Sequence, residues 1–490
     1  MTTHPGRALR SVLVAGGGIT ALSAAIAFAR ALPAVRIGLL ETPPDPAALV
    51  DRLPSTMASI NVFHRRIGVE EVDLVRSGAA THIVGTRFEN WGEQSWYFVH
   101  GDYGLPGNPT PFHWIWLSAW KAGKAGPFDA YSAPAALAAA ERFVHPDRDP
   151  ASPLHAFDYD LRLDPGRYRD FLLGLADRLG IARTHGEIGG AEQREDGGIA
   201  AVALKDGRRI EADLFIDACG PSAPLLSIVG GAFESWSDFL PCDRVLIATR
   251  SGGQPSPTDT ISAMPWGWRW TSPSPDRSLH AYVHASSIAS GKDVRVAAGA
   301  DAEAISLRPG RRSEPWTRNV LAIGDAAVAL DPLHGAGSLL ARGAIQRALD
   351  LLPGRDAHPL VLREYNRLTE VESRRARDFL SLHYLACPRR YGAFWKAMAK
   401  RERPDSLAHI FRQWTYRSQL PFYQEATFTR DSWHAVLLGM GVMPRHIDHR
   451  ALALNPELSA LALQQAEATL KSLPARLPTY PDYLRRMMGR

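Results

Sequence analysis

The stretch RSVLVAGGGITALSAAIAFARAL, residues 10–32, decides the fold of this chain. Its apolar start predicts a buried strand, its three glycines predict a tight turn, and its alanine-rich remainder predicts a helix. A second apolar run, VRIGLLE at residues 35–41, predicts another strand and ends in an acid. Strand, turn, helix and strand in this order indicate an α/β fold of the Rossmann-like type with a parallel sheet.

The glycine turn also predicts a dinucleotide site. Gly16 permits the tight turn, and Gly18 lets backbone approach a pyrophosphate at the helix N-terminus, where free N–H groups and the helix dipole favour anions. Ala21 takes the place of the third glycine and still permits close packing of the helix. Glu41 lies 25 residues beyond Gly16, the distance at which an acid usually reaches a ribose hydroxyl.

Two later segments favour FAD over NAD. The run NVLAIGDAAVALDPLHGAGSLLARGAIQRAL at 319–349 resembles the second FAD motif of aromatic-hydroxylase-like flavoproteins, in which an aspartate holds the ribityl chain and a helix start faces the isoalloxazine. The run KDGRRIEADLFIDACGPSAPLL at 205–226 predicts a DG hairpin and a strand that closes the same domain. The predicted FAD contacts are Gly16, Gly18, Ala21, Glu41, Ile188, Asp325, Pro332, Gly335, Gly337 and Ser338.

Composition bounds the class of protein. The 490 residues are 45% hydrophobic and 22% charged, which predicts a large folded core. Three cysteines fit neither a disulfide framework nor a metal site, and we find no signal peptide and no apolar run long enough to cross a membrane, so we expect a cytoplasmic protein. The net charge of +5 is dispersed among acids, which argues against nucleic acid as a partner.

The chain resembles the flavin-dependent tryptophan halogenases almost from end to end. The resemblance rests on GGGITA, STMASINVFHRRIGVEE, RFENW, DLFIDACG, GWRWTSP and PGRRSEPWTRNVLAIGDAA. Trp268, Trp270 and Pro273 match the family signature WxWxIP, with Ser272 in place of the isoleucine. The resemblance implies reduced FAD from a separate flavin reductase, and oxygen and halide that yield hypohalous acid. A lysine assisted by a glutamate then delivers the halogen to an aromatic substrate.

The stretch ATHIVGTRFENW, residues 80–91, departs from that family at the lysine. Gap-free counting back from RFENW places Ile83 at the lysine position and His82 at the aromatic before it. The family glutamate falls on His334 in DPLHGAG, where Gly335 and Ala336 replace hydroxyl residues. A Gly-Glu pair of the family falls on residues 53 and 54, which are Leu and Pro here.

These departures decide the predicted chemistry. Isoleucine can neither donate a hydrogen bond nor carry charge, so the lysine-dependent step cannot run as the family runs it. A one-residue bulge that puts His82 at that position stays open, because a slip of one reverses the faces of a strand. For His82 and His334, a catalytic role and a place in the core stay equally open.

Domain organisation follows from the motifs. We predict an FAD-binding domain over 1–353, interrupted by substrate-side segments at about 46–154 and 222–314, and a mainly helical region over 354–490 that covers the substrate. His100 and Tyr103, in WYFVHGDYG at 96–104, and the Trp268–Trp270 pair are the predicted substrate and tunnel residues. Ordinary aromatic packing is the alternative for both segments.

Three functions compete on this basis. The favoured one is an FAD-dependent monooxygenase-type oxidation of an aromatic or indole-like substrate, because the halide and lysine groups are replaced. The second is a genuine halogenase with rewired, histidine-based groups, and the third is a flavin-binding relative without catalysis. The expected partners are a small aromatic substrate and a flavin reductase, while use of halide and the oligomeric state stay open.

Overall fold

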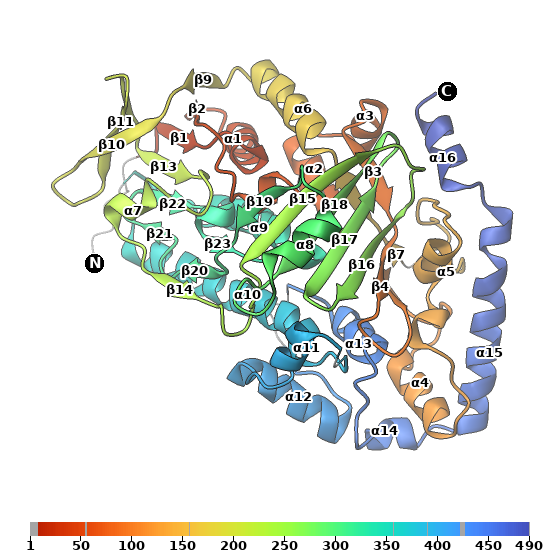
Figure 1. Ribbon diagram of the computed structural model, residues 1–490. Coiled ribbons are helices and arrows are strands. Elements are labelled where there is room, and N and C mark those ends of the chain that lie inside the picture. Colours follow the sequence, from red (N-terminus) through yellow and green to blue (C-terminus); the bar gives the residue numbers. More distant parts are fainter. Residues whose placement is uncertain are drawn as a thin grey trace, which may run out of the picture. The chain divides into compact units, whose positions relative to one another are not determined.

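The computed structural model describes residues 8–53, 56–155, 157–355, 357–389, 391–421 and 427–489 (Figure 1). The chain falls into two compact units. Unit 1 comprises the residues up to Ala80, together with Arg162–Asp238 and Ile305–Arg374. Unit 2 comprises Thr81–Leu161, Phe239–Ala304 and the residues from Arg375 onward.

Unit 1 contains the predicted parallel sheet. Its strands lie in the order β21 (Trp316–Thr317), β22 (Val320–Ala322), β13 (Leu214–Asp217), β1 (Ser11–Ala15), β2 (Arg36–Glu41) and β9 (Ala182–His185). The pairs from β22 to β9 are parallel, and only the edge strand β21 is antiparallel to its neighbour. All five residues of β1 are buried, which explains its unbroken apolar sequence, since a parallel sheet is covered on both faces.

Helices cover this sheet, and helix α1 follows the glycine turn directly. The helices and turns of unit 1 are α1 (Ile19–Ala31), η1 (Leu49–Asp51), α2 (Ile60–Ile67), α3 (Glu71–Arg76), α6 (Pro165–Arg178), α7 (Leu226–Val229), η3 (Gly324–Ala326), η4 (Leu333–Gly335) and α9 (Ala336–Asp350). Two small sheets join them: β10 (Ile188–Gln193), β11 (Ile199–Leu204) and β12 (Arg209–Glu211), and β14 (Phe233–Ser235), β20 (Gly310–Arg312) and β23 (Val328–Ala329). Residues 20–28 of α1 are all buried, as expected for a helix rich in alanine and apolar side chains.

Unit 2 is built on the inserted sheet that carries the tryptophan pair. The strand order is β19 (Glu303–Ser306), β15 (Arg244–Ser251), β18 (Arg277–His284), β17 (Gly267–Pro273), β16 (Thr258–Met264), β4 (Gly85–Glu89) and β5 (Trp96–Phe98). Strands β15 to β18 run side by side as the green arrows of Figure 1. Short strands β3 (Ala80–Ile83), β6 (His100–Gly101), β7 (Phe157–Asp158) and β8 (Asp160–Leu163) form two further two-stranded sheets.

The C-terminal part is helical, as predicted. Its elements are α10 (Pro359–Leu385), α11 (Ala393–Met398), α12 (Asp405–Arg417), α13 (Arg430–Gly439), α14 (His449–Leu452), α15 (Pro456–Ser472), η5 (Pro474–Arg476) and α16 (Tyr480–Met487). Unit 2 also contains helices from earlier segments of the chain, namely α4 (Phe112–Lys121), η2 (Phe128–Tyr131), α5 (Ala133–Ala139) and α8 (Gly291–Ala298). Side-chain caps fix four of the starts, because Thr429, Asp448, Asn455 and Thr479 accept hydrogen bonds from the first-turn N–H groups of α13, α14, α15 and α16. The α/β fold with an added sheet and a helical C-terminal region is thus confirmed, whereas the predicted domain boundaries stay predictions. Within the described ranges, no helix is long and apolar enough to cross a membrane.

Candidate active site

The glycine turn of unit 1 is a close crossing of three chain segments. The Gly16 N–H donates to Leu40 O at 3.0 Å, and φ of Gly16 is +147°. A Cβ at Gly16 would lie 2.4 Å from Ala218 O, and one at Gly17 would lie 2.1 Å from Thr42 O. Ala21 packs beside Gly16, because a Cβ at Gly16 would lie only 2.9 Å from Ala21 Cβ. The ends of β1, β2 and β13 therefore approach so closely that only glycine fits in the turn.

Asp51 lies at the start of helix α1. Its Oδ1 accepts hydrogen bonds from the backbone N–H and from the hydroxyl of Thr20, both at 2.8 Å. A Cβ at Gly18 would lie 1.9 Å from Asp51 Oδ2. Burial raises the pKa of Asp51, and the bonds from Thr20 oppose that rise. The site where an anion would meet this helix thus already holds a carboxylate of the chain.

Turn η1 also contacts the second predicted motif. Asp325, in η3 after strand β22, is buried and accepts a hydrogen bond from Val50 N at 3.0 Å. Burial first, and then the carboxylates of Asp51 and Asp45, raise the pKa of Asp325 to about 8. The structure therefore gathers three acids beside the glycine turn, of which the sequence identified only Asp325.

The start of helix α9 has the predicted glycine turn. Pro332 precedes η4, and His334 and Gly335 both adopt left-handed backbone, with φ of +58° and +63°. His334 is buried. Gly337 packs against turn η1, since a Cβ there would lie 2.8 Å from Val50 Cγ2. Ser338 Oγ accepts from Arg342 at 2.5 Å, in the first turn of α9.

Glu41 ends strand β2, which is the position from which an acid binds the ribose in dinucleotide-binding folds. Its carboxylate already pairs with two arginines. Its Oε2 lies 3.2 Å from Arg169 Nη2 and its Oε1 lies 3.3 Å from Arg183 Nε. Arg169 also donates to Gly17 O at 2.9 Å, so this arginine joins Glu41 to the glycine turn. Ile188, half-buried at the start of β10, pairs with Leu204.

These residues fit a flavin dinucleotide. The three glycines form a cradle in which no side chain has room, because neighbouring backbone and the Asp51 carboxylate lie against them. A helix begins beside this cradle, and a buried aspartate begins the second motif. One adjustment is required, because an anion at the start of α1 has to displace Asp51. Leu53 is buried close to this turn, while Pro54 lies outside the described residues.

His82 and Ile83 lie on strand β3 of unit 2, and both are buried. The His82 ring stacks on Phe143, with centroids 4.2 Å apart, and its backbone N–H donates to Tyr480 Oη at 2.6 Å. Adjacent side chains on a strand point to opposite faces, so His82 and Ile83 cannot share one environment. Neither residue lines the large cavity described below.

The tryptophan pair belongs to the core of unit 2. Trp268 Nε1 donates to Tyr384 Oη at 2.7 Å. Trp270 Nε1 and Ser272 Oγ both donate to the buried carboxylate of Asp259, each at 3.0 Å. Serine in place of the family isoleucine thus supplies a second donor to Asp259. Both indoles are fully or almost fully buried, and neither lines the large cavity.

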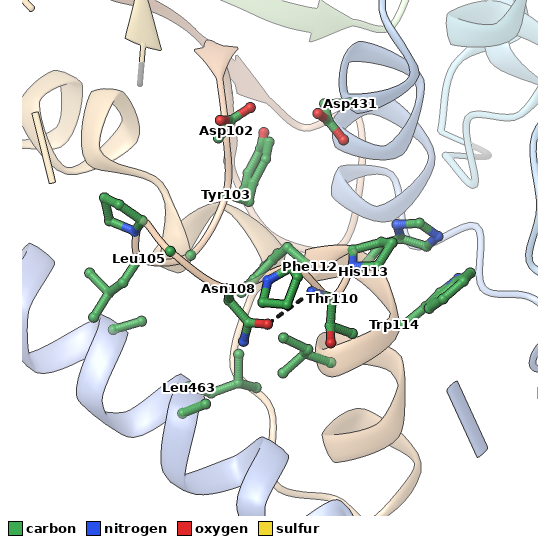
Figure 2. A pocket seen from close by; sticks show the side chains of 18 of the residues that line it. Asp102, Tyr103, Leu105, Asn108, Thr110, Phe112, His113, Trp114, Asp431 and Leu463 are labelled. Atoms are coloured by element: carbon green, nitrogen blue, oxygen red, sulfur yellow. Dashed lines mark hydrogen bonds between the residues drawn. The ribbon is translucent and has the colours of Figure 1, made fainter. Parts of the chain in front are cut away.

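A cavity of about 890 Å³ lies within unit 2, between the segment after β6 and helices α13 and α15 (Figure 2). Of the four predicted substrate and tunnel residues, Tyr103 lines it, and His100, Trp268 and Trp270 do not. His100 lies 3.5 Å from Asp160; burial lowers the pKa of His100, but the carboxylates of Asp160 and Asp158 outweigh it and raise that pKa.

The other cavity residues came without a sequence signal. His113 stacks on His434 with centroids 4.3 Å apart, and burial, with the His434 ring, lowers the pKa of His113 to about 3. Asp102 and Asp431 lie at one end of the cavity (Figure 2). These four side chains come from segments more than three hundred residues apart, so no local pattern links them.

A glycine cradle at the ends of parallel strands, with a buried aspartate directly after strand β22, is typical of a dinucleotide-binding protein of the α/β class. Within that class, residues 11–456 match the family described as tryptophan halogenase. The chain therefore belongs to the tryptophan halogenase family.

Solved relatives cover nearly the whole chain. BrvH, a flavin-dependent halogenase from Brevundimonas sp. BAL3, is 31% identical with a TM-score of 0.92, over 98% of this chain and 99% of that one. Xcc4156, a flavin-dependent halogenase from Xanthomonas campestris, is 30% identical with a TM-score of 0.91, over the same shares. Tryptophan 6-halogenase SttH from Streptomyces toxytricini is 26% identical over 469 residues, or 86% of each chain.

The predicted family is thus confirmed, and the chain is an enzyme of the flavin-dependent halogenase type. The family implies FAD as the cofactor, a flavin reductase as a partner and an aromatic or tryptophan-like substrate. The assignment of Ile83 and His334 to the lysine and glutamate positions stays a prediction.

Proposed function

We propose that this enzyme halogenates an aromatic substrate with reduced FAD, oxygen and halide, and that it does so without the lysine and glutamate of its relatives. The observation that carries the proposal is the full-length likeness to two flavin-dependent halogenases at 30% and 31% identity. The glycine cradle of unit 1 supports it, because dinucleotide-binding folds require this close backbone approach in the turn after the first strand.

In this proposal the residues of unit 1 hold and orient the cofactor. The start of α1 would bind the pyrophosphate once Asp51 has moved, Glu41 would bind a ribose hydroxyl, and Asp325 would hold the ribityl chain. The start of α9 would stabilise negative charge on the flavin ring. Bound FAD supplies the electrons that activate oxygen, and these electrons come from a separate reductase.

In the same proposal the cavity of unit 2 takes the substrate. Its volume of about 890 Å³ suits a ligand of one or two fused rings with a side chain, because small-molecule pockets span about 300–1,000 Å³. Tyr103, Phe112 and Trp114 line it and offer aromatic faces to such a ligand.

Oxygen insertion or another oxidation is the second candidate. Ile83 favours it, because a side chain that is 2% exposed and purely apolar cannot hold or polarise hypohalous acid at that strand. His82, its neighbour, is packed among aromatic rings and is not offered to the cavity.

The test is product analysis with a halide switch. The FAD-loaded enzyme, a flavin reductase and NADH are given a panel of indoles, phenols and anilines in bromide, in chloride and in halide-free buffer, under ¹⁸O₂. Halogenation gives products with the bromine or chlorine isotope pattern only when halide is present. A halide-independent product that carries ¹⁸O would replace our proposal by the second candidate, and flavin reduction by NADH alone would contradict the need for a reductase.

A further inference from the structure

One end of the unit 2 cavity combines two acids with a buried phenol. Asp102 and Tyr103 follow strand β6, and Asp431 lies in the first turn of α13. All three line the cavity, and Figure 2 shows the Tyr103 hydroxyl pointing to the end where both carboxylates lie. This end is the part of the cavity that the family assignment does not explain.

Tyr103 is the first of two independent observations. It is 8% exposed, with its ring packed against Phe128 at a centroid distance of 4.4 Å. Its buried hydroxyl has no hydrogen-bond partner among the described residues. Burial first, and then Asp129 and Asp431, raise the pKa of Tyr103 well above its usual value, so the hydroxyl keeps its proton. Buried hydroxyls are rarely left without a partner, which indicates that a ligand supplies one.

The charge at this end is the second observation. Burial, and then the carboxylates of Asp431 and Asp158, raise the pKa of Asp102, and no basic group pairs with it within the described ranges. Asp431 lies 3.4 Å from His434 Nδ1. Two carboxylates that repel each other at the same end of a cavity favour a positive ligand.

Two arginines also line the cavity, but their donors are directed elsewhere. Arg450 binds Asp448 through Nε and Nη2, both at 2.9 Å, and lies 4.3 Å over the Trp114 ring. Arg430 donates to Leu420 O at 3.4 Å. Neither guanidinium forms an ion pair with Asp102 or Asp431 in the described part of the chain.

We propose that this cavity binds an aromatic substrate with a side-chain amine, whose ammonium group is held by Asp102, Asp431 and the Tyr103 hydroxyl. The ammonium has three N–H donors, and the site offers three acceptors, namely the two carboxylates and the hydroxyl oxygen of Tyr103. The aromatic ring lies against Phe112, Trp114 and the stacked His113–His434 pair. The inference rests on the proposed function, which is halogenation of the aromatic ring, but the inference itself concerns only how the substrate is bound.

The test is binding of three indole probes that differ in charge. Tryptamine carries an ammonium, tryptophol is a neutral analogue with a hydroxyl, and indole-3-propionate carries a carboxylate. Titration calorimetry of the FAD-loaded full chain should show tryptamine binding about tenfold more tightly than tryptophol, with indole-3-propionate weakest. Equal affinities for tryptamine and tryptophol would overturn the proposal.

Variants locate the effect. Asp102→Asn and Asp431→Asn should each weaken tryptamine binding about threefold and leave tryptophol within twofold, because both carboxylates are partly exposed and screened by solvent. Tyr103→Phe, which keeps the ring, should also weaken tryptamine selectively. The matched control is Asp293→Asn, an exposed aspartate on α8, which should change nothing.

Two further arms separate this inference from its rivals. A calcium titration without any indole distinguishes a metal site; calcium binding that Asp102→Asn abolishes, with no preference for tryptamine, would overturn the amine proposal. Because binding is measured without turnover, a preference for tryptamine supports the inference even if no halogenated product forms. Halogenation of neutral indoles without that preference would leave the proposed function standing and remove this inference alone.

Discussion

The Asp51 carboxylate and the Thr20 backbone N–H are joined by a 2.8 Å hydrogen bond at the start of helix α1, and the Thr20 hydroxyl donates to the same oxygen at 2.8 Å. Asp51 therefore occupies the position at which a dinucleotide-binding helix receives a pyrophosphate. The cofactor and this side chain compete for the same N–H groups.

Asp51→Asn should tighten FAD binding. Asparagine keeps an oxygen that accepts from Thr20 but removes the negative charge that the pyrophosphate has to displace. We expect the dissociation constant of FAD to fall about threefold to tenfold, measured by quenching of flavin fluorescence. The control is Asp73→Asn, an exposed aspartate on α3. Weaker binding in Asp51→Asn would mean that Asp51 holds FAD and does not exclude it.

Gly18→Trp should abolish FAD binding. Even a Cβ at residue 18 would meet Asp51 Oδ2 at 1.9 Å, and an indole would fill the space of the pyrophosphate. The matched control is Gly291→Trp, because a Cβ at that surface glycine meets no atom within 4 Å. Circular dichroism should show that both variants are folded. Unchanged flavin content in folded Gly18→Trp would show that FAD does not bind at this glycine turn.

Asp325 should make the stability of the cofactor-free protein depend on pH. In the unfolded chain its carboxyl loses a proton near pH 3.8, whereas in the folded protein it keeps the proton up to about pH 8. The folded state therefore binds more protons between these values, so the free energy of unfolding falls as pH rises, by at most about 1.4 kcal/mol per pH unit. Urea denaturation of wild type and Asp325→Asn at pH 5, 6, 7 and 8 checks this. The stability of the variant relative to wild type should rise with pH, and a constant difference would contradict it.

Ile83→Lys and His334→Glu test the positions predicted for the family lysine and glutamate. Ile83→Lys alone should recover little bromination, because an ammonium in a site that is 2% exposed is desolvated and its pKa is lowered. The double variant should exceed the sum of the single variants by a coupling of about 1 kcal/mol or more, as expected for groups that stabilise each other's charge. The readout is brominated product per reduced flavin. Strictly additive effects would indicate that the alignment at one of these positions is wrong.

Tyr384→Phe tests the structural part of the tryptophan motif. The change leaves Trp268 Nε1 buried without its 2.7 Å partner, so the free energy of unfolding should fall by about 1–3 kcal/mol. Tyr391→Phe, at a side chain that is 68% exposed, should stay within about 0.5 kcal/mol of wild type. Equal stability of the two variants would show that this hydrogen bond contributes nothing.

The sequence predicted those features that local patterns encode. Strand β1, the glycine turn, α1 and β2 follow from one apolar run, three glycines and an alanine-rich segment, and the hairpin of β11 and β12 follows from Asp206-Gly207. Asp325 could be predicted because the strand before it and the helix after it belong to one continuous stretch of sequence. In each case the neighbours along the chain are also the neighbours in space.

The missed features depend on distant contacts. Asp51 lies in a three-residue turn without a motif, and only folding brings it to Thr20. His82 meets Tyr480, a residue 398 positions away, so its burial among aromatic rings had no local signal. The amine site likewise joins Asp102 and Tyr103 to Asp431 on α13. Hydrophobic periodicity and motif spacing in the sequence cannot predict such pairs of residues, because the pairs depend on how the strands and helices pack.

Turn η1 has a kinetic consequence. Its two neighbouring residues make different bonds, Asp51 to Thr20 and the Val50 N–H to Asp325, so moving the turn disturbs both predicted cofactor motifs together. If FAD enters only molecules in which the turn is open, its apparent affinity is reduced by the open fraction. The observed association rate should then level off at high FAD concentration, at the rate with which the turn opens.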